Sequence, residues 1–233
     1  IFNSNWSKKR FLEKMNSDAI NSEKLLVINQ SATKNKINFK NKKKIITFVG
    51  KLNRSKGYDL FGKAVIEILK NYKDWSAYVI GDEPRDQLEF KHDRLFKLGF
   101  KEHKEVINIY KKTNIAVVCS RWEEPFGRTS LEAAANGCAV IISDRGGLPE
   151  TITNGRILKK LTVSEIYNNI KELIINSKVR KKYQLLSYKN FYLSHQYVSK
   201  QIDDVRNNLL RINKPSLLLE TKNLRIIHIT NFN

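Results

Sequence analysis

The sequence predicts an α/β fold built on a Rossmann-like, doubly wound parallel sheet. Short apolar runs rich in β-branched residues recur along the chain. Segments with helical spacing of apolar residues separate these runs, and a glycine follows several of them. Short buried strands that alternate with amphipathic helices are typical of repeated βαβ units. Right-handed crossovers between such strands give a doubly wound sheet.

The regular alternation of strands and helices begins at Ile45. In the first expected helix, apolar residues recur every three or four positions, as they do on one face of a helix. The expected strands are Ile45–Val49, Ala77–Ile80, Leu95–Leu98, Ile115–Cys119 and Ala139–Ile142. The expected helices are Tyr58–Tyr72, Val106–Lys112, Ser130–Asn136, Val163–Asn176, Lys178–Tyr188 and His195–Leu210.

The two ends of the chain follow a less regular pattern. Ser7–Met15 has the spacing of a short helix with Ser7 as its N-cap, and Leu25–Asn29 is a brief apolar run typical of a strand. The Lys-rich stretch 31–44 has few apolar residues to bury and is interpreted as a linker. Leu224–Ile229 is another strand-like run. We therefore expect one regular domain with shorter segments on either side.

The formal net charge of +20 narrows the function classes. It indicates an anionic partner (nucleic acid, an acidic membrane face or a phosphorylated substrate) or a biased codon composition, and both interpretations stay open. Cys119 and Cys138 lie in or beside apolar runs, which argues against a disulfide framework and fits a reducing compartment. No apolar stretch approaches the ~18 residues that cross a bilayer. The four histidines lack metal-ligand spacing and are expected at the surface or at helix ends.

Glycines, charges and turn residues collect directly after the expected strands. In open parallel α/β sheets, ligands bind beyond the carboxyl ends of the strands. The segments at these ends are Gly50–Gly57, Gly81–Pro84, Ser120–Arg128 and Ser143–Gly147. The sequence therefore predicts a ligand crevice at this edge of the sheet.

The first of these segments holds two cations. Lys51 and Lys56 are framed by Gly50 and Gly57, and glycine lets a backbone approach a ligand closely. Two ammonium groups can pair with a diphosphate. A Lys-rich chain contains many such pairs, so this segment alone is a weak indication of a phosphate site.

The segment after the fourth strand is more specific. Glu124 and Glu132 are separated by seven residues, and a helix is expected to begin near Arg128. The free N–H groups of its first turn form an anion site. Because carboxylates repel a diphosphate, the sugar and ribose hydroxyls of a ligand are their suitable partners. The alternative is that Glu124 is a surface loop residue and Glu132 lies on a solvated helix face.

These segments together resemble a known family. The Glu-Pro-Phe-Gly-x4-Glu motif at Glu124–Glu132 resembles the E-x7-E signature of the group 1 retaining glycosyltransferases (family 4, GT-B fold). Val140–Glu150 is similar to the strand and Gly-Gly-x-x-Glu loop of that family, and Gly50–Gly57 to its Gly-Arg-x4-Lys-Gly loop. The resemblance extends from about residue 45 to about residue 210. It implies the C-terminal, donor-binding half of a GT-B enzyme.

The resemblance implies a role for each matching residue. Glu124 would bind hydroxyls of the donor sugar, Glu132 would hold the ribose, and the backbone near Phe100 would lie against the base. Lys51 and Lys56 would pair with the diphosphate and stabilise the departing nucleotide. The implied donor site comprises Gly50, Lys51, Lys56, Phe100, Glu124, Phe126, Gly127, Arg128 and Glu132, with catalytic roles for Lys51, Lys56 and Glu124. The resemblance implies a site that uses no metal ion. It also implies no cofactor, since the nucleotide-diphosphate sugar is itself a substrate.

Three positions depart from the family pattern. Lys51 stands where arginine is usual, which keeps the charge but loses the bidentate geometry. Asn29-Gln30-Ser31 replaces a common Asn-Gly turn, and Asn154–Leu158 is a shortened version of a Gly-rich loop. These departures bear on donor preference more than on the fold.

The resemblance also divides the chain. Residues 1–43 are expected to be the end of a truncated N-terminal acceptor domain with a linker, and residues 44–212 the nucleotide-sugar-binding domain with its crossover helix. Residues 213–233 are either the start of a second glycosyltransferase unit or a disordered or edge-packed tail. The chain is thus expected to be a fragment that binds a nucleotide sugar weakly and does not transfer it.

The implied function is sugar transfer, with retention of configuration, to a glycan or lipid-linked acceptor in polysaccharide or glycan synthesis. A sugar-nucleotide epimerase of the same architecture and a non-catalytic nucleotide-sugar module remain alternatives. Nucleic acid is not an expected partner, because the chain lacks aromatic and basic residues interleaved on a sheet face. A cytoplasmic enzyme is expected, held at the inner membrane face by the basic stretch Lys34–Lys44.

Overall fold

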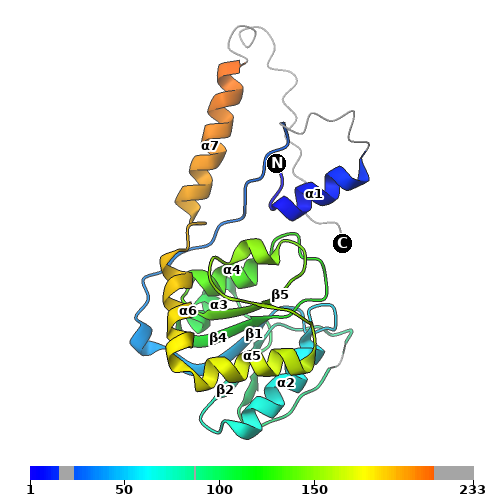
Figure 1. Ribbon diagram of the computed structural model, residues 1–233, viewed down its shortest axis with the longest axis vertical. Coiled ribbons are helices and arrows are strands. Elements are labelled where there is room, and N and C mark those ends of the chain that lie inside the picture. The colour runs from blue at the N-terminus through cyan, green and yellow to red at the C-terminus, as the bar shows by residue number, and fades with distance from the viewer. Residues whose placement is uncertain (16–23, 87, 213–233) are drawn as a thin grey trace.

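The computed structural model describes residues 1–15, 24–86 and 88–212 of the chain. In this part of the chain, six strands form one parallel sheet in the order β3-β2-β1-β4-β5-β6 (Figure 1). The strands are β1 Lys43–Val49, β2 Ser76–Ile80, β3 Leu95–Lys97, β4 Thr113–Val118, β5 Ala139–Ser143 and β6 Arg156–Leu158. The chain winds outward from β1 in both directions, which confirms the predicted doubly wound α/β class.

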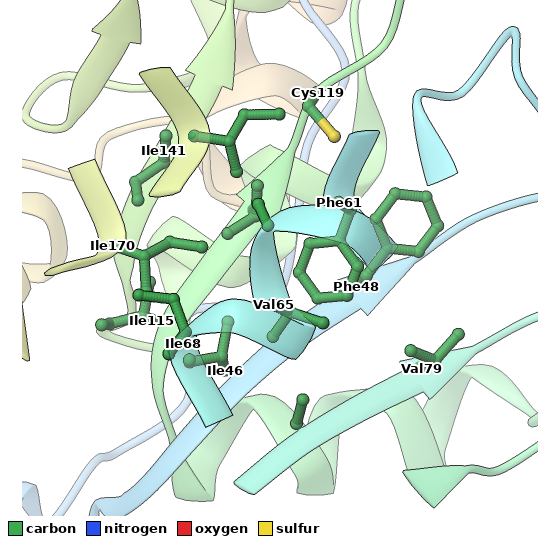
Figure 2. Packing of buried hydrophobic residues seen from close by; sticks show 14 of the residues in the cluster. Ile46, Phe48, Phe61, Val65, Ile68, Val79, Ile115, Cys119, Ile141 and Ile170 are labelled. Carbon is green, nitrogen blue, oxygen red and sulfur yellow. The ribbon is translucent and has the colours of Figure 1, made fainter. Parts of the chain in front are cut away.

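Two layers of helices cover the sheet. The helices are α1 Asn5–Lys14, α2 Tyr58–Asn71, α3 His103–Lys112, α4 Arg128–Ala135, α5 Val163–Ile175, α6 Ser177–Lys189 and α7 His195–Ile212, with 3-10 turns η3 Phe39–Asn41 and η4 Leu148–Thr151. Phe61 of α2 and Ile170 of α5 pack with Ile46, Ile115 and Ile141 of the strands on one face (Figure 2). The buried faces of α3 and α4 pack on the other face. Strands β4 and β5 are buried along their whole length, as expected of central parallel strands.

The N-terminal elements differ from the prediction. The first helix begins at Asn5, and its N-cap is Ser4 rather than Ser7, because the Ser4 hydroxyl accepts the N–H of Ser7 at 3.0 Å. The predicted strand Leu25–Asn29 is reduced to a single parallel bridge between Phe2 and Val27. The Phe2 N–H donates to Leu26 and the Ile28 N–H donates to Phe2, both at 2.8 Å, across this bridge. The predicted strand Leu224–Ile229 lies outside the described residues.

Strand β6 is an element that the sequence does not reveal. Its three residues, Arg156–Leu158, resemble a shortened loop in sequence, yet they pair with Ile141–Ser143 of β5. A run of three residues is too short to show the alternation of apolar and polar residues that marks a strand. Its conformation is therefore set by pairing with β5. The last helix, α7, extends away from the sheet (Figure 1). No helix in the described ranges is long and apolar enough to span a membrane.

Loops at the carboxyl edge approach one another more closely than side chains allow. Gly57 has φ +76°, and a Cβ atom there would overlap the carbonyl oxygen of Cys119 at the end of β4. Gly81 has φ +126°, and its Cβ would overlap the carbonyl oxygen of Gly50. Gly50 in turn donates its N–H to Ile80 at 3.0 Å. Glycine therefore brings the segments after β1, β2 and β4 together at this edge.

We expect Gly57→Ala to destabilise the chain more than Gly99→Ala does. Both glycines have positive φ, so both variants carry the left-handed strain of roughly 1–2 kcal/mol. A Cβ atom added at Gly57 would also overlap backbone atoms of Cys119, whereas a Cβ atom at Gly99 has no atom within 4 Å among the described residues. Urea unfolding of the two variants measures the difference. Equal losses in the free energy of unfolding would contradict the role of the close approach.

Candidate functional site

The segments after β1 and β4 meet directly. The N–H groups of Arg121 and Trp122 both donate to the carbonyl oxygen of Ser55, at 2.8 and 3.1 Å. The Ser120 hydroxyl donates to the same carbonyl at 3.2 Å. The carbonyl of Ser55 thus gathers three donors and fixes one segment against the other. The structure therefore joins two of the four segments that the sequence predicts at this edge.

Lys56 and Glu124 form an ion pair where these two segments meet. Their Nζ and Oε1 atoms are 2.5 Å apart, and the Glu124 side chain is only 13% exposed. The Lys56 side chain is 31% exposed, so its ammonium group remains open to a ligand. The Lys56 N–H donates to the side chain of Asn53 at 3.0 Å, which fixes the turn that carries it. The sequence predicted that both residues serve one ligand, and the structure places them in contact.

Glu132 lies in the second turn of α4 with its side chain 8% exposed. Its Oε1 atom accepts from Arg128 Nε and Nη2, at 3.3 and 3.2 Å, and lies 3.1 Å from His103 Nε2. Within the described ranges, no hydrogen bond is recorded to the other oxygen, Oε2. The two basic groups therefore orient the carboxylate and leave one oxygen for a further donor.

His103 is a site residue that sequence reasoning missed. It begins α3, whose capping box is formed by Glu102 and Glu105. The expected place at the surface or a helix end is confirmed, but its contact with Glu132 was not predicted. The available signal was its position after β3, at the same carboxyl edge as the other segments.

The remaining predicted residues divide by exposure. Lys51 is exposed, and no ion pair is recorded for it in the described part of the chain. Phe100 is 75% exposed, whereas Phe126 is 1% exposed and packs in the core between α4 and the sheet. Gly127, with φ +109°, is the N-cap of α4. Because its side chain is in the core, only the backbone of Phe126 can face a ligand.

The glycine pair after β5 holds the backbone of Glu124. Gly146 has φ +59°, and a Cβ atom there would overlap the carbonyl oxygen of Glu124. The Gly147 N–H donates to that same oxygen at 2.6 Å. The Gly146 N–H donates to the side chain of Glu123 at 2.6 Å. Three of the four predicted segments thus converge on the Lys56–Glu124 pair.

A second ion pair joins the segment after β4 to the first turn of α2. Arg121 donates to Asp59 in a bidentate arrangement, with distances of 2.6 and 2.8 Å. Burial alone would raise the pKa of Asp59, but the hydrogen bonds and charge of Arg121 outweigh it and lower that pKa. A carboxyl group with a lowered pKa adds stability above its unfolded pKa and loses it as the pH falls through the folded value. Nothing in the sequence pattern marks this pair.

The arrangement suits a ligand that is both anionic and rich in hydroxyl groups. Arg128 and Lys56, which pairs with Glu124, supply positive charge near the N-terminus of α4, where free N–H groups attract anions. Lys51 is exposed on the same segment as Lys56. Glu124 and Glu132 supply the carboxylate oxygens that hydroxyl groups prefer.

Known proteins resemble this chain. The family model "Glycosyl transferases group 1" matches residues 29–189. Spore coat protein SA of Bacillus subtilis is 31% identical over 127 residues, which are 49% of this chain and 34% of that protein. The lipopolysaccharide core biosynthesis mannosyltransferase LpsB of Rhizobium meliloti is 33% identical over 123 residues, 48% of this chain and 35% of that protein. The matched region spans about a third of each relative.

Solved structures agree with this match. The C-terminal domain of the glycosyl transferase group 1 family protein LpcC from Francisella tularensis is 32% identical, with a TM-score of 0.56 over 62% of this chain and 82% of that chain. HepE of Anabaena, solved with UDP-glucose, has a TM-score of 0.70 and 18% identity over 89% of this chain and 63% of that chain. At that identity the second likeness supports the fold only. The chain therefore belongs to the glycosyl transferases group 1 family, and its sheet is the C-terminal, Rossmann-like domain of a GT-B fold.

Proposed function

We propose that the protein containing this chain transfers a sugar from a nucleotide-diphosphate donor to an acceptor with retention of anomeric configuration, as a family 4 enzyme. The observation that carries the proposal is the Lys56–Glu124 ion pair beside the N-terminus of α4. It brings a cation for phosphate and a carboxylate for sugar hydroxyls into contact at the carboxyl edge of the sheet. The named functions of the relatives support transfer over epimerisation.

The two lysines take the diphosphate in this proposal. Lys56 is positioned by its own ion pair, and Lys51 is exposed on the same segment. Their ammonium groups pair with the phosphate oxygens and stabilise the negative charge that develops on the departing nucleotide. Because the protein supplies this charge itself, we propose transfer without a metal ion or other cofactor.

The two glutamates take the sugars. Glu124 accepts hydrogen bonds from the donor sugar, alongside the backbone of Phe126 and Gly127. The free Oε2 atom of Glu132 accepts from the ribose, while Arg128 and His103 hold the other oxygen. The backbone near the exposed Phe100 lies against the base.

The relatives indicate the class of donor and acceptor. HepE has been solved with UDP-glucose, and LpsB is named a mannosyltransferase of lipopolysaccharide core biosynthesis. We extend this to a nucleotide sugar as donor and to a glycan or lipid-linked acceptor in polysaccharide synthesis. Residues 1–43 are then the end of an acceptor domain plus a linker, and residues 44–212 are the donor domain.

Nucleotide sugars should stabilise the chain, and Lys51→Met should weaken their binding. We expect about a tenfold loss of affinity, equivalent to roughly 1.4 kcal/mol, because one charge-assisted contact to phosphate is removed. The screen uses thermal shift with UDP-glucose, GDP-mannose, UDP and GDP, followed by calorimetry, with and without EDTA. Lys70→Met is the matched control, since Lys70 is exposed in the last turn of α2 and pairs with Glu67.

Several outcomes would contradict this proposal. Equal affinities for the parent chain and Lys51→Met would remove that lysine from the donor site. A loss of binding in EDTA would contradict transfer without a metal ion. A parent chain that none of the four ligands stabilises would contradict donor binding by this edge of the sheet.

The 233-residue chain alone should bind the donor but not transfer the sugar. The proposed acceptor domain contributes only residues 1–43 to this chain, so the acceptor side of the reaction is incomplete. Chromatography of labelled donor, incubated with the chain and a lipopolysaccharide-type acceptor, measures transfer. Full turnover by this chain would contradict the proposed domain division.

We also propose that the protein works in the cytoplasm, with its basic N-terminal stretch at the inner membrane face. Part of this stretch is engaged internally: Lys42 donates to the carbonyls of Tyr110 and Asn136, at 2.9 and 2.6 Å, and burial lowers its pKa. Lys44 pairs with Asp74. Lys34 donates to the carbonyls of Lys189 and Phe191, at 3.4 Å each. The exposed lysines that can meet anionic lipid headgroups are Lys36, Lys40 and Lys43.

Membrane contact predicts cosedimentation with acidic vesicles. The chain should pellet with phosphatidylglycerol-containing vesicles at low salt and be released at high salt, because screening weakens surface electrostatics. Neutral phosphatidylcholine vesicles are the control. Failure to pellet with the acidic vesicles at low salt would rule the contact out.

A further inference from the structure

Glu150 holds the start of the first helix from more than a hundred residues away. Its Oε2 atom accepts the N–H of Asn5 at 2.8 Å, and its Oε1 atom accepts the N–H of Trp6 at 2.9 Å. The Asn5 side chain also donates to Oε2, at 2.9 Å. A carboxylate at this point satisfies two free N–H groups and complements the helix dipole. The last residue of the Gly-Gly-x-x-Glu loop is therefore a cap for α1.

The same helix start contacts the loop that carries Glu124. The buried Ser4 hydroxyl donates to the carbonyl oxygen of Pro125 at 2.5 Å. The Ser7 hydroxyl lies 3.1 Å from that oxygen, also as a donor. Two hydroxyl groups at the start of α1 thus converge on the residue that follows Glu124.

The backbone of Glu124 and Pro125 is held between α1 and the loop after β5. The carbonyl oxygen of Glu124 accepts from the Gly147 N–H at 2.6 Å, while that of Pro125 accepts from Ser4. A Cβ atom at Gly147 would lie 2.5 Å from the Pro125 oxygen and 3.0 Å from Ser4 Oγ. The three segments are therefore packed without room for a methyl group. A shift of α1 would move the backbone on which the Glu124 side chain depends.

We propose that Glu150 is a positioning residue for the sugar end of the donor site. By capping α1, it keeps Ser4 against Pro125 and so fixes the Glu124 carboxylate where it meets the donor sugar. This inference rests on the proposed function, because it assigns a sugar to Glu124. It adds that the segment before residue 14 shapes the donor site, although that segment lies outside the Rossmann-like sheet (Figure 1).

The test compares Glu150→Gln with Glu67→Gln in the 233-residue chain. The glutamine at 150 keeps the size but loses the charge and one of the two acceptor oxygens. Glu67 is an exposed glutamate on α2 that pairs with Lys70, so its substitution removes the same charge away from the site. Ser4→Ala removes the hydroxyl contact to Pro125 and leaves Glu150 in place. Amide hydrogen exchange is read in peptides that cover residues 120–130 and 143–149.

We expect amide exchange in both peptides to be faster than in the parent chain for Glu150→Gln and Ser4→Ala. For Glu67→Gln we expect the exchange rate to be unchanged. The second readout is the ratio of affinities for UDP-glucose over UDP, and for GDP-mannose over GDP. Because a misplaced Glu124 carboxylate loses a charge-assisted hydrogen bond to the sugar, we expect this ratio to fall about tenfold in Glu150→Gln. The affinity for the free nucleotide should fall less than the affinity for the nucleotide sugar, because Lys51 lies on a separate segment and only Lys56 contacts Glu124 directly.

The two readouts separate the possible failures. Faster exchange in peptides that cover α1, with an unchanged rate in the peptide that covers residues 120–130, would show that Glu150 is only a helix cap. That result would overturn the proposal. Faster exchange in 120–130 with an unchanged sugar-to-nucleotide ratio would overturn it as well. A parent chain that binds none of the four ligands would instead overturn the proposed function, and the exchange data would still decide whether Glu150 holds the loop.

Discussion

The site depends on the close approach of backbone segments at the carboxyl edge of the sheet. Cβ atoms at Gly57, Gly81 or Gly146 would overlap carbonyl oxygens of Cys119, Gly50 or Glu124. Each of these glycines also has a positive φ, which other residues rarely adopt. The parallel sheet brings the segments to one edge, but these glycines allow them to touch. The contact between Lys56 and Glu124, 68 positions apart, follows from that approach.

Much of the fold can be predicted because burial leaves a periodic trace in the sequence. Strands β4 and β5 contain the continuous apolar runs Ile115–Val118 and Ala139–Ile142. The strands of the sheet that the sequence predicts agree with the structure within a few residues. Strand β6 leaves no such trace, since three residues at a sheet edge take their conformation from their partner. The cap of α1 was assigned to the wrong serine because the helix start is fixed partly by Glu150, a distant residue.

The site can be predicted less completely than the fold. Glycines and charges after the strands indicate the correct edge, and the spacing of Glu124 and Glu132 indicates a pair of carboxylates. The partners of these groups do not follow from spacing. The contact of His103 with Glu132 and the cap that Glu150 provides depend on how helices settle on neighbouring loops. Such contacts require three-dimensional register, which local pattern does not encode.

The ion pair between Lys56 and Glu124 affects how substitutions at either position should be interpreted. Each side chain is mostly withdrawn from water and neutralises the other. Replacing one of them leaves an opposite charge half-enclosed without its counter-ion, which has its own energetic cost. A weaker ligand affinity in such a variant therefore has two contributions: the lost contact with the ligand, and the changed free energy of the rearranged, ligand-free site. Only a double-mutant cycle over both positions separates the two contributions.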